Sequence, residues 1–145
     1  PDEPFARLYY AAFAIAQSVR DNLLFIQRIF TDSADNIAIA NEFLKSEMEE
    51  RTRVIVGLLE ECAAIDDRVP TATIQRLGYL SSAVIAPMVL GTRFNSMGLL
   101  SDELSRNVGA LLTDEAISQR LEWAVCAMFP SRLECVGIRP DRKKQ

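Results

Sequence analysis

The sequence predicts an all-α domain, a bundle of five or six helices. Every long segment repeats its apolar residues with a period near 3.6, and no segment shows the alternation of a strand bounded by turns. The chain has 145 residues, of which 49% are hydrophobic and 25% charged. That composition is too apolar for a disordered chain and sufficient for a single buried core. We therefore expect one folded domain, over residues 1–131.

The first helical region is expected at about Glu3–Phe30. Pro4 falls in its first turn, where the missing N–H is harmless. A stripe that includes Phe5 and Leu8 marks its buried face. The segment "SVRDN" is expected to interrupt this region, because Ser, Asp and Asn side chains compete for backbone hydrogen bonds and favour caps and turns.

A second, long helix is expected at about Asp35–Ile65, with Asp32 or Ser33 as its N-cap. Its middle, "KSEMEERTR", is polar on most sides. Glu47 and Arg51 stand in the favourable i,i+4 order, as do Glu49 and Arg53, so these pairs support the helix. The helix is therefore expected to be half exposed along its length and to end before Pro70, which excludes the helical conformation from the preceding residue.

A third helix is expected at about Ala72–Leu90, with Pro87 kinking it or marking its last turns. No charged residue occurs between positions 77 and 92. A helix that is apolar nearly all round must be covered nearly all round. This uncharged stretch is therefore the part of the chain that most needs a partner surface.

Two shorter helices are expected to complete the domain. Ser101 caps a helix at about Asp102–Leu112, and Thr113 caps a final helix at about Asp114–Phe129. The final helix carries apolar residues on more than one face, with Trp123 beside its main stripe. It is the last helix expected along the chain, so its surplus apolar surface also needs a cover.

The uncharged helix and the final helix can be covered within one subunit or by a second copy. Small residues along one flank make the surface self-complementary, which favours a two-fold homodimer. The residues expected at the dimer interface are Leu77, Ser81, Val84, Ile85, Met88, Leu121, Ala124, Val125 and Met128.

The charge distribution argues against nucleic-acid binding by the folded domain. The chain has a net charge of −4, and residues 1–131 hold 18 acidic and 11 basic residues. Phosphate binding needs a positive surface. Residues 132–145 hold 2 acidic and 5 basic residues and are expected to form a solvated, flexible tail.

The chemistry of an enzyme is missing from the sequence. There is no histidine, which removes the commonest general base and the commonest metal ligand. Cys62, Cys126 and Cys135 lack zinc-site spacing, and no glycine-rich phosphate loop is present. We expect no enzymatic activity, no metal and no cofactor. Unpaired cysteines and the lack of an apolar run of roughly 18 residues indicate a cytoplasmic protein that does not contact a membrane.

The order of the segments resembles a known family. "NIAIANEFLKSEMEERTRVIVGLLEECAAI", "DDRVPTATIQRLGYLSSAVIAPMVLG", "SDELSRNVGALL" and "TDEAISQRLEWAVCAMF" follow one another as in the C-terminal regulatory domain of TetR-family transcriptional repressors, over about residues 4–130. The resemblance implies that an N-terminal helix-turn-helix, absent from this sequence, contacts DNA. It also implicates the helices at 72–90 and 114–129 in a four-helix dimer interface.

The resemblance further implies a small, often hydrophobic effector among the helices, whose binding changes the spacing of the two DNA-binding domains. It predicts a cavity of about 300 Å³ or more in each subunit. Each candidate lining residue is also a common core residue. The candidates are Tyr10, Phe13, Gln17, Phe43, Met48, Tyr79 and Met88.

An alternative function is a helical adaptor that binds a partner protein through the same apolar helices. An adaptor predicts an exposed apolar patch and no internal cavity. A small helical enzyme similar to a chorismate mutase is a third possibility, but it needs arginines that converge inside the bundle. The arginines of this chain are too scattered along the helices for that arrangement.

Overall fold

A computed structural model describes residues 3–66 and 70–131, and in these ranges it is all-helical, which confirms the predicted fold class. The predicted tail at 132–145 lies outside the described residues. The described part holds seven α-helices, more than the five or six expected, because the predicted third helix is two. They are α1 (Pro4–Asp21), α2 (Leu23–Ala34), α3 (Ala38–Ile65), α4 (Thr73–Val84), α5 (Ala86–Ser96), α6 (Asp102–Asn107) and α7 (Asp114–Met128), with a 3₁₀ turn, η1 (Val108–Leu111), before α7.

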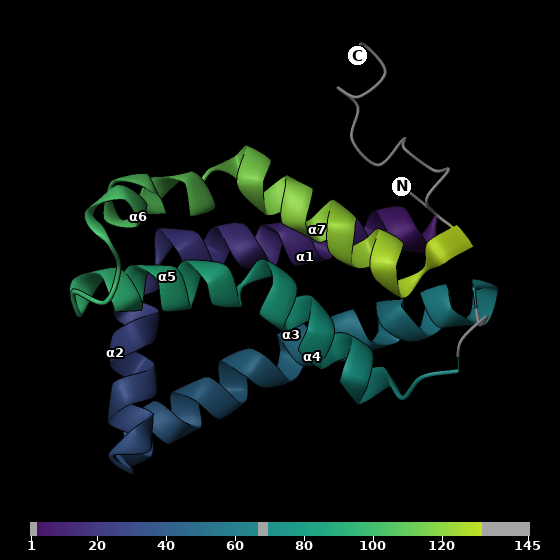
Figure 1. The fold of residues 1–145 in the computed structure, drawn as a ribbon. Helices are drawn as coiled ribbons and strands as arrows, with labels where there is room; N and C mark the ends of the chain where they lie inside the picture. The colour runs from purple at the N-terminus through teal and green to yellow at the C-terminus, as the bar shows by residue number, and fades with distance from the viewer. Residues whose placement is uncertain (1–2, 67–69, 132–145) are drawn as a thin grey trace.

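The helices form one packed layer, and α2 with the beginning of α3 forms an arm that leaves this layer. α1 contacts both α3 and α7, and α4 contacts α3 and α7 (Figure 1). α2 leads away from the end of α1 and meets the beginning of α3, which slants back beneath α1 and α4. α2, α3 and the α1–α5 layer therefore form three sides of a triangle.

Local sequence signals set most helix ends where they were predicted. Pro4 lies in the first turn of α1, Ser101 caps α6, and Thr113 caps α7 by accepting a hydrogen bond from the Ala116 N–H. The predicted break after α1 is confirmed at Asn22, whose side-chain amide donates to the Ser18 carbonyl oxygen.

The predicted N-cap of the long helix is wrong. α2 continues through Asp32 and Ser33 to Ala34, and α3 begins only at Ala38. The turn between them places Asn36 at a φ of 59°, a left-handed conformation that asparagine adopts more readily than most residues. The Ser33 hydroxyl bonds instead to the Asn41 side chain, across the turn.

Pro87 divides the uncharged stretch into two helices rather than kinking one. It sits in the first turn of α5, and the axes of α4 and α5 differ by 46°. Proline lacks an N–H and its ring crowds the carbonyl four residues earlier, so α4 cannot continue. Arg120 of α7 donates two hydrogen bonds of 3.3 Å to the Val84 carbonyl oxygen at this break. Burial lowers the pKa of the Arg120 guanidinium.

α4 and α5 are also the one place where the described helices approach the requirements of a membrane span. No single described helix is long and apolar enough to cross a bilayer. Taken together across their bend, α4 and α5 meet that test of length and composition.

The core lies between α1, α3, α4 and α7. Phe5 of α1 packs edge-to-face on Phe129 after α7, with ring centroids 5.3 Å apart. The Tyr9 and Ser118 hydroxyls hydrogen-bond in this interior, which satisfies both buried groups. α2 contributes no buried residue. Other core side chains that are closed to solvent are Leu8, Leu59, Cys62, Met88, Ile117, Leu121 and Val125.

An ion pair joins the end of α1 to the beginning of α7. Arg20 lies 2.5 Å from an Asp114 carboxylate oxygen and also donates to the Leu112 carbonyl oxygen. The hydrogen bond from Arg20 lowers the pKa of Asp114 below its ordinary value of 3.8. The stabilisation is present above that ordinary value and is lost as the pH falls through the lowered pKa of the folded state.

We expect the Asp114→Asn variant to melt at a lower temperature than the parent protein at neutral pH, by a small margin. The difference should shrink as the pH falls below 3.8 and through the lowered pKa of the Asp114 carboxyl, because the parent protein then loses the charged carboxylate as well. Thermal unfolding followed by circular dichroism, at neutral pH and at a series of pH values below 3.8, measures it. Asp102→Asn is the control, because Asp102 holds the same first position in α6 and has no ion pair among the described residues. An equal loss of melting temperature in both variants would contradict the assignment of the stabilising ion pair to Arg20 and Asp114.

Gly57 lies in the interior of α3, and a Cβ built on it meets nothing within 4 Å. We expect Gly57→Ala to raise the free energy of unfolding by about 1 kcal/mol, since alanine restricts the unfolded chain and favours the helix. Gly98 has a φ of +72°, a left-handed conformation that alanine adopts only with strain. Gly98→Ala should destabilise by about 1 kcal/mol, and urea denaturation of both variants tests the contrast.

Candidate ligand-binding site

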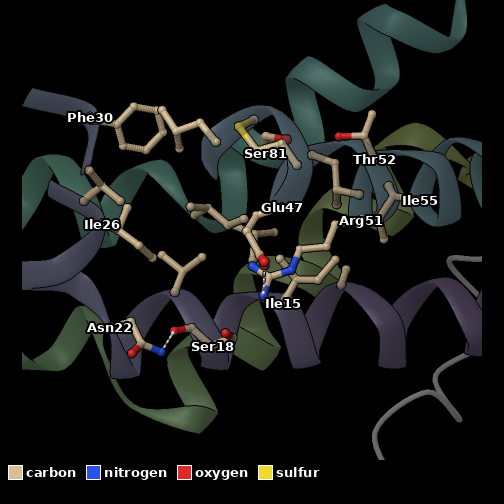
Figure 2. A pocket seen from close by; sticks show the side chains of 18 of the residues that line it. Ile15, Ser18, Asn22, Ile26, Phe30, Glu47, Arg51, Thr52, Ile55 and Ser81 are labelled. Carbon is tan, nitrogen blue, oxygen red and sulfur yellow. Dashed lines mark hydrogen bonds and ion pairs between the residues drawn. The ribbon is translucent and has the colours of Figure 1, made fainter. Parts of the chain in front are cut away.

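A cavity of about 520 Å³ lies between α1, α2, α3 and α4 (Figure 2). It fills the triangle that the departing α2–α3 arm leaves beside the core. Several of its lining side chains, including Phe30 and Met48, are partly exposed, so the cavity opens to solvent. The apolar lining includes Ile15, Phe25, Ile26, Phe30, Phe43, Leu44, Met48, Ile55, Leu77, Leu80, Val84, Ile85 and Val89.

The cavity exists because α1 and α3 separate. The buried residues of α3 lie mostly in its C-terminal half, from Ile55 to Cys62, where it packs on the beginning of α1. The N-terminal half of α3 instead contacts α2, and Phe25 and Phe43 meet edge-to-face with centroids 5.6 Å apart. Phe25, Ile26 and Phe30 of α2 therefore face the cavity, whereas Leu23 packs against the core.

One charged pair belongs to the cavity wall. Glu47 and Arg51 are the only ionisable residues in its lining, and their nearest charged atoms are 3.7 Å apart. Their side chains are 48% and 45% exposed, so the pair contributes little to stability. Figure 2 shows both side chains reaching from α3 towards α1. The uncharged polar residues of the lining are Ser18 of α1, Asn22 between α1 and α2, Thr52 of α3 and Ser81 of α4.

Two of the predicted ligand-binding residues, Phe43 and Met48, line this cavity. The other five lie elsewhere. Met88 is closed inside the core, Phe13 stacks on Tyr9, and Gln17 donates to the Asp114 carboxylate. Tyr79 is exposed on α4, and Tyr10 borders a second hollow between α1 and α3.

The contribution of α2 to the cavity was not predicted from the sequence. Phe25, Ile26 and Phe30 line the cavity. The spacing of Ile26 and Phe30 marks an apolar face on α2. The useful signal was the predicted break at "SVRDN", because a helix that turns away after a break takes its apolar face away from the core.

Eight of the nine residues predicted at the dimer interface are buried or half-buried within the subunit, and Ser81 is exposed. Met128 is half-buried against the core. The stripe of α7 is covered by α1 and α4 of the same subunit, which the helical period alone could not show. Leu77, Ser81, Val84 and Ile85 line the cavity, and Met88, Leu121, Ala124 and Val125 are closed inside the core.

α4 and α7 each carry a large exposed side chain. Tyr79 and Trp123 are 46% and 58% exposed. Ser82, Gln119 and Ala127 are also exposed on these two contacting helices, and none of the five residues is charged. We call these five residues the α4–α7 face.

Residues 3–66 and 70–131 contain no group of three or more His, Cys, Asp or Glu side chains placed to hold a metal ion. No protein-family profile, curated protein or solved structure matches the chain. The cavity and the exposed helix faces are therefore the features that bear on function.

Proposed function

We propose that this chain is the effector-sensing and dimerisation domain of a TetR-like transcriptional repressor. The cavity between α1 and α4 binds a small, largely hydrophobic molecule, and the α4–α7 face pairs two copies. DNA binding belongs to an N-terminal domain outside this sequence. The cavity is the observation that carries the proposal.

The size and lining of the cavity support a ligand site. Its volume of about 520 Å³ exceeds the 300 Å³ expected and falls within the usual range of small-molecule pockets. A mostly apolar wall with a few polar groups is the usual composition of such pockets. The alternative, a helical adaptor, predicted an interior without a cavity, so the cavity favours the ligand-binding hypothesis.

The arrangement of the helices gives a route from ligand to DNA-binding domain. α2 has no buried residue to hold it in one position, so a ligand that fills the cavity adds contacts that favour one position of the α2–α3 arm. α1 supplies Ile15, Ser18 and Val19 to the same wall. An N-terminal domain would connect to the beginning of α1, so a displacement of α1 would pass directly to it.

A neutral apolar dye, N-phenyl-1-naphthylamine, tests the cavity. We expect saturable binding with a rise in dye fluorescence, and Ser81→Phe should weaken it at least about tenfold because the new ring occupies the cavity. Ser46→Phe is the control, since Ser46 is an exposed residue of α3 outside the lining. The proposal fails if the dye does not saturate, or if both variants bind equally well.

The α4–α7 face supports the homodimer. Tyr and Trp are among the residues that most often dominate the binding energy of protein–protein interfaces. The α4–α7 face carries one of each, and none of its five residues is charged. Pairing two copies of α4 and α7 would form a four-helix contact around a two-fold axis. Its small residues, Ser82 and Ala127, would allow the helices to approach closely.

Trp123 is the single tryptophan of the chain, so its fluorescence reports on this face directly. We expect a dimer by light scattering at tens of micromolar, and an emission maximum that shifts to the red on dilution. Trp123→Glu should yield a monomer. Leu24→Glu, at an 85% exposed position of α2, should remain dimeric. A monomeric parent protein, or equal dissociation of both variants, would rule out this interface.

A further inference from the structure

The guanidinium of Arg51 has unused hydrogen-bonding capacity inside the cavity. An arginine carries five N–H donors in a planar fork. Among the described residues, the contact with Glu47 is its one polar interaction, and at 3.7 Å it is longer than a charge-assisted hydrogen bond of about 2.8 Å. The fork is therefore open to a second acceptor on the cavity side (Figure 2).

The other polar groups of the lining can also donate to a ligand. Ser18, Thr52 and Ser81 line the cavity, and no hydrogen bond joins their hydroxyls to another described residue. Each hydroxyl can donate one hydrogen bond and can also accept. Glu47 carries the only carboxylate among the described lining residues. Arg51 is therefore the lining group that most strongly favours an acceptor, because a guanidinium donates and does not accept.

Arg51 lies apart from one apolar part of the cavity wall. In Figure 2, Ile26 and Phe30 lie together on one side, and Arg51 lies on the other side, where Ile55 is also drawn. An elongated molecule with one polar end fits this division, because its chain can cover Ile26 and Phe30 while its head meets the guanidinium.

We infer that the ligand is an amphipathic carboxylic acid whose carboxylate binds Arg51 and whose hydrocarbon chain lies against Ile26 and Phe30. The inference rests on the proposed function, since it names the ligand class of the same cavity. A carboxylate matches the two-donor fork of a guanidinium. An amine would pair with Glu47 but would face the Arg51 charge, and an alcohol would leave most of the fork unused.

Decanoate, decanol and decylamine differ only in their heads, and their binding is measured by displacement of N-phenyl-1-naphthylamine. We expect decanoate to bind at least about tenfold more tightly than decanol, and decylamine to bind least tightly. Arg51→Gln should weaken decanoate about tenfold and leave decanol unchanged. Glu47→Gln should tighten decanoate by about threefold, because it removes a nearby negative charge.

Arg53→Gln and Glu49→Gln are the matched controls, since both residues lie on α3 outside the cavity lining and should leave all three affinities unchanged. Decanol binding as tightly as decanoate, or an Arg51→Gln variant that still prefers decanoate, would overturn the carboxylate inference while the cavity site stands. Binding of decylamine more tightly than decanoate would also overturn the carboxylate inference. If none of the three displaces the dye and the dye itself does not bind, the proposed function fails as well.

Discussion

The packing of the first half of α1 against α3 and α7 is the constraint on which the rest of the structure depends. Phe5 and Leu8 are closed between these helices, and Phe129 completes the contact. α3 packs on α1 mainly through its C-terminal half, and its N-terminal half diverges towards α2. The space left beside the second half of α1 is the cavity, and its wall is a continuation of the core stripe through Ile15 and Val19.

The sequence predicted features that depend on neighbouring residues and not those that depend on which helix covers which. Ser101 and Thr113 act through hydrogen bonds within one turn, and Pro4 lacks an N–H that the first turn would leave unpaired, so their positions could be read directly. Leu121 and Val125 share a stripe on α7, but the period that identifies a stripe does not say whether α1 or a second copy covers it. Leu121, Ala124 and Val125 are therefore core here, although they were predicted at a dimer interface, and Trp123, beside the stripe, is exposed.

The candidate site shows the same division. The pairing of Glu47 with Arg51 follows from their i,i+4 spacing and is confirmed. Its place on the wall of a cavity depends on the separation of α1 and α3, which no local pattern encodes. Phe43 and Met48, two of the seven predicted ligand-binding residues, do lie on its wall. The aromatic residues of α1 were not separable from core by type alone.

The absence of buried residues from α2 has a consequence for how such a domain can diversify. Substitutions at core positions usually cost stability, whereas substitutions at partly exposed positions usually cost little. Ile26 and Phe30 therefore lie on a wall that can be remodelled while the α1–α3–α7 core stays intact. Related domains can then acquire new chemical preferences through one helix, without having to rebuild the fold that carries it.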